Sequence, residues 1–396
     1  MAPPTEQSIP VTYIRGGTSN APFFYDHDLP PAGPKRDRFL QRIMGSPDPM
    51  QIDGLGGTNI VTSKIAIISK SDRPGVDVEY NFVQVGIVDD VVAYNANCGN
   101  ISSGVGPFAI DEGLLKEQRE GVRIDESLET KEVRIWNTNT QKLLVEHVPI
   151  NPKTGKALEA GDFEISGCPG TGAPILLDYR NVIGSQLGGS ALPTGNATDR
   201  TTVDGLEVEY TVCDVANICV FARAQDLQIH GNEASAALDE NKKLLARMKE
   251  LRGKAAQKIG MCKDWRAVDE ESPMVPFVGL ISPATREDCH IQSRLFLDNK
   301  CHTAMAGTGA TCTAAASKIR GSIVNQIARP QSKSETEFRI QHPSGYIPVV
   351  VKVKPGTEDQ PIPDFDTLSF IRTSRRFWDG HLYIPDDVKY CFEETN

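Results

Sequence analysis

CGNISSGVGPFAIDEGLL at residues 98–115 and AGTGATCTAAASKI at residues 306–319 are the two stretches that decide the fold. Each opens with glycine beside asparagine or threonine and continues with small, apolar residues on every face. A helix that is uncharged all round is typical of a protein interior. Because one such stretch lies in each half of the chain, the sequence predicts two similar domains, each a β-sheet rolled around a central buried helix.

Runs of residues that are typical of β-strands flank both stretches, and each run is bounded by the Gly, Pro, Asn or Asp residues of turns. Strands in both halves around few helices predict the α+β class. The runs are IPVTYIRG (9–16), KIAIISKS (64–71), VEYNFVQVGI (78–87), VRIWNT (133–138), LEVEYTVCD (206–214), ANICVFAR (216–223), FRIQHPSG (338–345) and IPVVVKVK (347–354).

The domain organisation is predicted from length and composition. At 396 residues the chain exceeds what one hydrophobic core usually supports. Residues 181–203 are rich in Gly, Ser, Asn and Thr and lack periodicity, so we place the boundary there. The predicted domains are residues 1–185 and 186–396. Residues 233–258 form the clearest amphipathic pattern and are expected to be a surface helix.

The formal net charge of -10 argues against a nucleic-acid or anionic-membrane surface, since either requires clustered lysines and arginines. It does not argue against a small acidic substrate, because a few arginines in one cleft can hold carboxylates. The N-terminal sequence lacks a targeting signal and no apolar run reaches membrane-spanning length, so a cytoplasmic protein is expected. Nine cysteines without a CxxC pair favour reduced thiols over disulfides or structural zinc. The oligomeric state stays open, a homo-oligomer included.

Lys64 is the first candidate for chemistry. It lies in DGLGGTNIVTSKIAII (53–68), where a glycine-rich loop leads into an apolar strand. Partial desolvation at this point favours the neutral amine, which can act as a base. The alternative, an ordinary lysine at a strand edge that reaches solvent, is favoured by composition alone.

The two glycine-led helix openings are the second candidates, because a helix N-terminus presents unpaired N–H groups and a partial positive charge. They are Gly99-Asn100 and Gly307-Thr308-Gly309. If these N-termini converge, the cleft between the domains would hold a polycarboxylate by its ends. The alternative is that the glycines only allow a buried helix to pack closely. Cys98 opens the first helix, where the backbone dipole favours a reactive thiolate over an inert buried thiol.

RGGTSN at residues 15–20 is a third glycine-rich turn, in which Arg15, the backbone at Gly17 and the hydroxyls of Thr18 and Ser19 are candidates for binding a carboxylate. A tight turn without a ligand is the alternative. No segment has the pattern of a P-loop, a dinucleotide-binding turn, a GxSxG nucleophile elbow or an HExxH zinc site. We therefore expect neither a nucleotide cofactor nor a metal.

Several motifs, taken in order along nearly the whole chain, resemble the PrpF family of methylaconitate isomerase-like proteins. They are RGGTS at 15, DGLGG and TSKIAI within 53–67, NCGNISSGVGPFAI at 97–110, DFEISGCPGTGAPILLDY at 162–179, CHTAMAGTGATCTAAAS at 301–317, HPSG at 342 and RTSRRFWDGHLYIP at 372–385.

The resemblance implies a diaminopimelate epimerase-like fold, with the active site in the cleft between the two domains. It also implies an isomerase that acts on an unsaturated di- or tricarboxylate without a cofactor. The lysine of the TSK motif corresponds to Lys64 and the cysteine of the CGN motif to Cys98. Epimerases of this fold use a second cysteine, at a position that Ala306 occupies here, so racemisation by two thiols is disfavoured. The family motif commonly continues RGGTSKG, and Asn20 stands in place of its lysine, which puts the usual substrate in doubt.

The expected reaction is an allylic proton shift. Neutral Lys64 removes the proton, and the N–H groups of the two helix openings stabilise the dienolate oxygens. Cys98 returns the proton, polarises the substrate or exchanges roles with Lys64, and sequence does not choose among these. Arg15, Thr18, Ser19 and His302 are binding candidates, and cis-aconitate or a methylaconitate is the expected substrate.

Three other functions stay open. The first is a keto-enol tautomerase of an oxalomesaconate-type acid, which would use the same residues. The second is a non-catalytic binding or accessory protein, to which the altered motif at Asn20 lends some weight and against which the intact Lys64 and Cys98 argue. The third is an epimerase, which would require Cys301 or Cys312 to reach the cleft, although core packing is expected for both.

Overall fold

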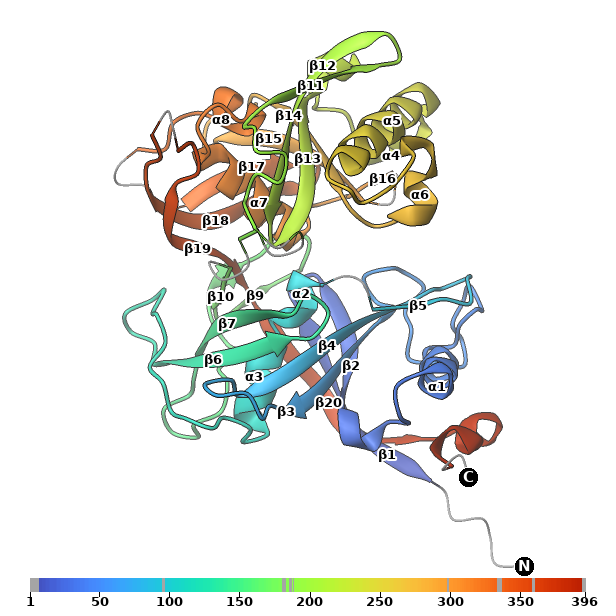
Figure 1. Cartoon of the computed structure of the whole chain (residues 1–396). Coiled ribbons are helices and arrows are strands. Elements are labelled where there is room, and N and C mark those ends of the chain that lie inside the picture. Colours follow the sequence, from blue (N-terminus) through green and yellow to red (C-terminus); the bar gives the residue numbers. More distant parts are fainter. Residues whose placement is uncertain are drawn as a thin grey trace, which may run out of the picture. The chain divides into compact units, whose positions relative to one another are not determined.

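The computed structural model describes residues 7–94, 97–179, 183–184, 187, 189–297, 299–332, 337–357 and 360–393. The chain forms two compact units, the first comprising Met1–Leu177 with Arg372–Asn396 and the second Asp178–Ile371. Both combine a sheet with a few helices (Figure 1). The expected α+β class with two domains is confirmed.

The first unit contains most of the predicted site residues. Its strands are β1 (Ser8–Gly16), β2 (Ser19–Tyr25), β3 (Lys64–Lys70), β4 (Val78–Val85), β5 (Val92–Ala93), β6 (Thr130–Asn137), β7 (Lys142–Pro149), β8 (Phe163–Glu164), β9 (Thr171–Gly172), β10 (Ile175–Asp178, whose last residue belongs to the second unit) and β20 (Ser374–Tyr383). Its helices are α1 (Pro34–Met44), α2 (Gly99–Ser102) and α3 (Val105–Asp111), with 3-10 turns at Asp26–Asp28 and Asp386–Phe392.

The second unit has a comparable set of elements. Its strands are β11 (Asp199–Val203), β12 (Leu206–Val215), β13 (Asn217–Arg223), β14 (Phe277–Ser282), β15 (Ile291–Leu297), β16 (Lys300–Cys301), β17 (Glu337–His342), β18 (Gly345–Lys354) and β19 (Asp364–Arg372, whose last residue belongs to the first unit). Its helices are α4 (Ser235–Glu240), α5 (Lys242–Lys258), α6 (Val268–Glu271), α7 (Gly307–Lys318) and α8 (Ile323–Ile327), with 3-10 turns at Ala224–Leu227 and Trp265–Ala267.

Strand pairing shows that the two units share one topology. In the first unit the order is β20-β1-β2-β3-β4-β6-β7, and every neighbouring pair is antiparallel except β2–β3 and β4–β6. In the second unit the order β11-β12-β13-β14-β15-β17-β18 has its parallel pairs, β13–β14 and β15–β17, at the same two places. A buried helix follows the fifth strand of this order in both. The predicted similarity of the two domains is therefore a similarity of topology, although little of it is visible in the sequence.

The C-terminal strand corrects the predicted domain limits. The boundary expected between residues 185 and 186 lies outside the described residues. The prediction also assigned everything after that point to the second domain, whereas residues 372–396 return to the first unit. Strand β20 pairs with β1 over the full length from Ser8 to Gly16, so the first sheet is completed by the end of the chain.

Two predicted helices are interrupted, each for a local reason. The helix expected at 98–115 is divided into α2 and α3, because Pro107 in a continuous helix would clash with the carbonyl of residue 103. The helix expected at 233–258 is divided into α4 and α5 by Asn241. The side chain of Asn241 accepts a hydrogen bond from the N–H of Leu244 at 3.0 Å and thereby caps α5.

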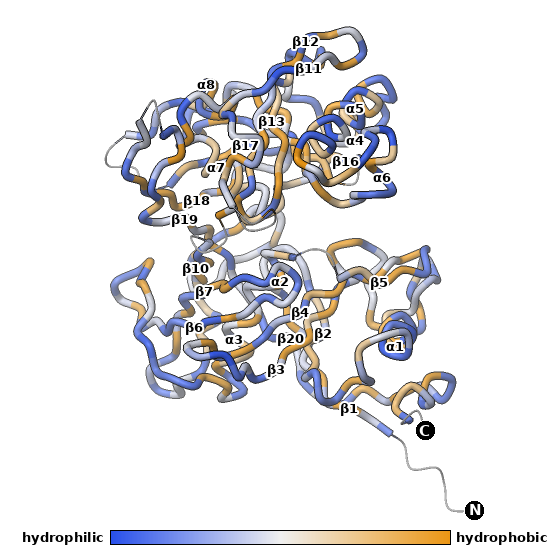
Figure 2. The backbone as a smooth tube through the Cα atoms, viewed as in Figure 1, coloured by the Kyte–Doolittle hydropathy of each residue, from blue (hydrophilic) through white to orange (hydrophobic). Residues whose placement is uncertain are grey.

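The cores form around the helices expected to be buried. In α7, every residue except Lys318 is buried, and the helix contacts β12, β13 and β18. In α3, the residues from Val105 to Ile110 are buried, and the helix contacts β6 and β7. Strand β13 is hydrophobic along most of its length (Figure 2), as expected for a strand covered on both faces. Among the described residues, no helix is both long enough and apolar enough to cross a membrane.

Glu146 on β7 supports α3 from inside the first core. Its Oε2 accepts a hydrogen bond from the N–H of Gly106 at 2.9 Å, and a side chain at Gly106 would place Cβ 2.4 Å from this oxygen. In the described part of the chain, Oε1 of Glu146 has no hydrogen-bond partner. Burial raises the pKa of Glu146 well above its ordinary value, and the Gly106 hydrogen bond opposes the shift. The folded protein therefore retains a proton here that the unfolded chain loses.

Glu146→Gln is expected to become more stabilising relative to wild type as pH rises. A carboxyl whose folded pKa is raised costs stability above its unfolded pKa of 4.5, whereas glutamine does not titrate. The difference in unfolding free energy should grow from about pH 4.5 towards neutrality by at most about 1.4 kcal/mol per pH unit. Urea denaturation across this range measures it, with exposed Glu126→Gln as the control. A difference that does not change with pH would show that Glu146 ionises normally.

Candidate active site

The hairpin turn between β1 and β2 forms one side of the candidate site. Gly16 pairs with Ser19 across a two-residue turn made by Gly17 and Thr18. Gly17 has φ +53°, which only glycine adopts without strain at this first position of a type II′ turn. The N–H of Gly17 also bonds to the carbonyl of Thr373 at 2.9 Å, so the turn is tied to the end of the chain.

The start of α2 lies directly against this turn. A Cβ at Gly16 would lie 2.2 Å from the carbonyl oxygen of Asn100, and a Cβ at Gly17 would lie 2.3 Å from its side-chain oxygen. Neither distance is compatible with a side chain, so both glycines are required by the contact. The RGG sequence therefore allows backbone to approach backbone, and this contact brings Gly17, Thr18 and Asn100 together.

Arg372 fixes the orientation of the Asn100 amide. Its Nε donates to Oδ1 of Asn100 at 2.8 Å, and Nδ2 of Asn100 donates to Oγ1 of Thr18 at 3.0 Å. Because a guanidinium can only donate, the amide oxygen must face Arg372 and the amide nitrogen must face Thr18. Thr18 accepts this bond, and its own hydroxyl hydrogen is therefore directed elsewhere. Arg372 was not among the predicted site residues, although the RTS motif that contains it was noted.

Arg15 and Ser19 differ in how their polar atoms are used. Nη1 of Arg15 donates to the carbonyls of Gly17 at 2.8 Å and Thr373 at 2.9 Å, so this nitrogen serves the turn itself. Burial lowers the pKa of the Arg15 guanidinium, while the nearby Cys168 and Glu159 oppose the shift. Ser19 is 3% exposed, and among the described residues its Oγ has no hydrogen-bond partner. A buried, unpartnered hydroxyl beside the turn suits the predicted contact with a carboxylate.

Cys98 lies immediately before α2, at its N-cap position. Its carbonyl accepts bonds from the N–H of Ser102 at 2.8 Å and from the Ser102 hydroxyl at 3.0 Å, which secure the short helix from its start. Of the nine cysteines, seven are buried, and Cys98 and Cys168 are partly exposed. Cys98 is thus a partly exposed cysteine two residues before Asn100.

Lys64 is the first residue of β3 and is 8% exposed. Its Nζ donates to Oε1 of Gln84 at 2.7 Å and lies 5.1 Å from the centre of the Phe82 ring. The interpretation of Lys64 as a solvent-reaching lysine at a strand edge is therefore wrong. No hydrogen bond joins Lys64 to Cys98 in the ranges that the structure describes, so the two groups are held separately.

The predicted site residues of the second unit serve packing as well. A Cβ at Gly307 would lie 2.5 Å from the Phe370 ring, and one at Gly309 would lie 2.5 Å from Leu295. Close packing, the alternative considered for these glycines, is thus a sufficient reason for both. Thr308 is buried, and its Oγ1 accepts from Nδ2 of Asn217 at 2.8 Å.

His302 forms a hydrogen bond within its own turn, and the nearby cysteines are buried. Nδ1 of His302 accepts from the N–H of Ala304 at 3.0 Å, which holds the ring over its own turn. Cys301 and Cys312 are buried, in agreement with the expected core packing. Ala306 is the N-cap residue of α7, so the position where an epimerase would have its second cysteine carries a methyl group and no thiol.

Asn20, which replaces the lysine common in the resembled motif, bonds within the first unit. Its Oδ1 lies 3.1 Å from the hydroxyl of Tyr13, and that hydroxyl is also 3.1 Å from the carbonyl of Leu55. The Tyr13 ring stacks on Trp378 with the ring centres 5.5 Å apart. A neutral side chain therefore joins the hairpin to the loop before β3.

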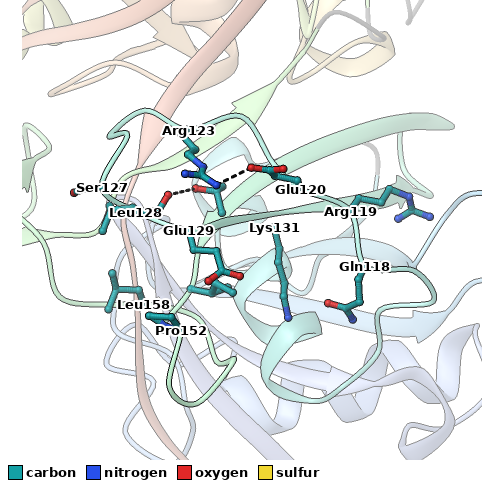
Figure 3. Close-up of a pocket in the computed structure, with 12 residues that line it drawn as sticks. Gln118, Arg119, Glu120, Arg123, Ser127, Leu128, Glu129, Lys131, Pro152 and Leu158 are labelled. Carbon is teal, nitrogen blue, oxygen red and sulfur yellow. Dashed lines mark hydrogen bonds and ion pairs between the residues drawn. The ribbon is translucent and has the colours of Figure 1, made fainter.

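A surface pocket of about 600 Å³ in the first unit has a different set of lining residues (Figure 3). Both of its arginines are already paired with carboxylates, Arg123 with Glu120 at 2.7 Å and Arg119 with Asp77 outside the lining at 2.9 Å. The pocket contains none of the predicted site residues, and it is not part of the candidate site. Its lining consists of Gln118, Arg119, Glu120, Arg123, Ser127, Leu128, Glu129, Thr130, Lys131, Ile150, Pro152 and Leu158.

Comparison with known proteins shows relatives that match along almost the whole chain. The family described as "PrpF protein" matches residues 6–385. The 3-methylitaconate isomerase of Eubacterium barkeri is 40% identical, with 96% of this chain and 98% of that protein covered. The 2-methyl-aconitate isomerase of Cupriavidus necator is 34% identical at 96% and 98% coverage. The 4-oxalomesaconate tautomerase of Pseudomonas putida is 35% identical at 96% and 97% coverage.

Solved structures agree with this likeness. The crystal structure of a methylitaconate-delta-isomerase has a TM-score of 0.81 and 39% sequence identity, and 98% of each chain is covered. A hydroxyproline epimerase from Agrobacterium vitis has a TM-score of 0.54 at 10% identity, with 96% of this chain and 94% of that chain covered. The second likeness shows the fold alone, and it confirms the epimerase-like architecture.

Arg372→Ala is expected to lower the free energy of unfolding by roughly 1–3 kcal/mol, because the buried Oδ1 of Asn100 loses a hydrogen bond. Arg372→Lys keeps a donor but not the planar guanidinium, so its free energy of unfolding should lie between those of wild type and Arg372→Ala. Urea denaturation measures both, and Arg375→Ala is the matched control, since Arg375 lies three residues further along the chain, on β20, and is exposed. Equal stability of the two alanine variants would show that Arg372 does not support Asn100.

Proposed function

This chain belongs to the PrpF family, and we propose that it is an isomerase that moves a proton, and with it a double bond, within a small unsaturated polycarboxylic acid. The observation that carries the proposal is the full-length similarity to relatives that are named for such reactions, at 40% identity for the 3-methylitaconate isomerase. Lys64 and Cys98 supply two groups of the kind that a proton shift requires.

The chemical difficulty lies in removing a proton from carbon. A hydrogen next to a carboxylate and a double bond is weakly acidic, because the charge can spread over the conjugated system only once the proton has left. The base must therefore be positioned before reaction, and the developing negative oxygen must meet hydrogen-bond donors that are already in place.

Lys64 is proposed as the base. Lys64 lies at the start of a buried strand and is 8% exposed as a residue, so little reorganisation of water accompanies proton transfer. The neutral amine takes the allylic proton and becomes an ammonium, while the substrate becomes a dienolate. The electron pair of the broken C–H bond forms the new carbon–carbon double bond.

Cys98 is proposed as the acid that completes the shift. Its thiol donates a proton to the far carbon of the three-carbon system, and the thiolate is reprotonated when Lys64 gives up its proton. In the reverse direction the two groups exchange roles. Stabilisation of the dienolate oxygens is assigned to the N–H groups of Gly99 and Asn100, which have no acceptor within the helix that they begin.

Carboxylate binding is proposed at the hairpin turn. Ser19 has a buried hydroxyl without a partner among the described residues, and Thr18 is held by Asn100 with its own hydrogen available. Arg15 contributes positive charge beside them. His302, Gly307, Thr308 and Gly309 of the second unit stay predictions for the remaining contacts.

The first substrate candidates are cis-aconitate, which would give trans-aconitate, and a methylaconitate, and the similarity to the 3-methylitaconate isomerase adds that acid. A keto-enol tautomerase of an oxalomesaconate-type acid is the second candidate function, and the similarity to the 4-oxalomesaconate tautomerase favours it. Both reactions move a proton across the same three atoms. Absorbance of the conjugated enol distinguishes the tautomerase.

Proton NMR in deuterated water tests the base. Wild type should convert at least one acid among cis-aconitate, 2-methylaconitate, 3-methylitaconate and 4-oxalomesaconate, with incorporation of deuterium. Lys64→Ala should lower the rate by a factor of about 100 or more, since general-base catalysis contributes this much. Lys70→Ala, at the exposed end of the same strand, is the matched control. Failure of wild type to convert or exchange any of these acids would contradict the proposed function.

Cys98→Ala separates the acid from the base. If Lys64 alone removes the allylic proton, this variant should still exchange that proton for deuterium while the double bond fails to migrate, with a rate loss of about 100-fold or more. The same NMR experiment measures exchange and migration independently. Loss of both in Cys98→Ala, with exchange retained in Lys64→Ala, would reverse the two assignments.

A further inference from the structure

Gln84 lies directly opposite Lys64 on the neighbouring antiparallel strand. The register of β3 and β4 pairs these two residues, so their side chains project from the same face of the sheet. Phe82 also lies on that face of β4, with its ring centre 5.1 Å from Nζ. The environment of the Lys64 amine is thus made by two side chains of one strand.

The orientation of the Gln84 amide is fixed by the loop before β3. Its Nε2 donates to the carbonyl of Ser63 at 2.8 Å and to the carbonyl of Ile60 at 3.2 Å. Because both are acceptors, the amide cannot flip without losing both bonds. Oε1 of Gln84 therefore faces Lys64, and Nζ donates to it at 2.7 Å.

The partner of Lys64 is uncharged. In the part of the chain that the structure describes, no carboxylate forms an ion pair with Lys64, whereas the buried Arg36, Arg247 and Arg252 each have one. A carboxylate at 2.7 Å would hold the amine as an ammonium, which cannot remove a proton. An amide oxygen accepts one N–H and leaves the lone pair of a neutral amine directed away from Gln84. After proton transfer the same hydrogen bond becomes charge-assisted and persists.

We propose that Gln84 is a positioning residue for Lys64, whose neutral amide oxygen aims the amine and leaves it free to act as a base. This inference rests on the proposed function, because it assigns a role to a residue that acts only through Lys64. It also defines what position 84 must provide, which is an acceptor of hydrogen bonds without negative charge.

Two substitutions at position 84 test the inference in the full-length protein. Gln84→Glu keeps an acceptor but adds a charge, and it should move the rise of kcat/KM with pH to higher pH by about one unit or more. Gln84→Leu removes the acceptor, and it should lower kcat by about 10-fold or more while KM changes less than about threefold. Asn81→Asp is the matched control, since it adds the same charge on the opposite face of β4 and should leave the pH profile unchanged. Circular dichroism and thermal denaturation verify that each variant is folded.

The outcomes separate this inference from the proposed function. Active wild type, inactive Lys64→Ala and an unshifted pH profile in Gln84→Glu would overturn the role of Gln84 and leave the function intact. Should Gln84→Glu fail to fold, wild-type kcat in Gln84→Leu would overturn that role equally. Wild type that is inactive on every acid tested would overturn both. A shifted profile in Gln84→Glu but not in Asn81→Asp supports the inference.

Discussion

The candidate site of the first unit depends on one close contact between backbones. Gly16 and Gly17 lie so near Asn100 that a Cβ at either position would collide with it. The contact fixes the start of α2 against the hairpin turn and sets the Asn100 amide between Arg372 and Thr18. Binding hydroxyls, helix N–H groups and the Cys98 thiol are all positioned by this arrangement. Two short segments that are far apart in sequence are thereby held in direct contact.

Lys64 is positioned on a different principle. Buried cations in this protein are commonly paired with carboxylates, as Arg252 is with Asp269. Lys64 instead bonds to an amide whose orientation is fixed by two backbone carbonyls. A neutral partner orients the amine without stabilising the ammonium. A base in proton transfer must be correctly oriented and must be able to lose its own proton. The two halves of the proposed chemistry, acid and base, are therefore supported by separate hydrogen-bond networks.

Local patterns predicted the elements that local sequence determines. The eight strand runs lie on β1, β3, β4, β6, β12, β13, β17 and β18, and α7 lies where an uncharged helix was expected. The interruption of the first helix was not predicted, although Pro107 is visible in the sequence. Candidate residues such as Lys64 and Cys98 were found because each stands beside a distinctive turn or helix start.

The features that the sequence did not predict are those that depend on contacts between distant segments. The return of β20 to β1 joins residues at the two ends of the chain, and no local pattern encodes that register. Arg372 bonds to Asn100 across most of the sequence, and the role of Gln84 follows only from its position opposite Lys64. The packing role of Gly307 and Gly309 likewise became visible only once their neighbours Phe370 and Leu295 were known.

The central claim is that the hairpin turn, the start of α2 and Lys64 form one site for an unsaturated polycarboxylate. A crystal structure with tricarballylate, the saturated analogue of aconitate that has no double bond to move, tests it most directly. The account predicts a carboxylate in contact with Ser19 or Thr18 and the N–H groups of Gly99 and Asn100, with Nζ of Lys64 facing a methylene carbon. Tricarballylate bound elsewhere, for example in the pocket around Arg123 and Lys131, with the turn unoccupied, would contradict the account.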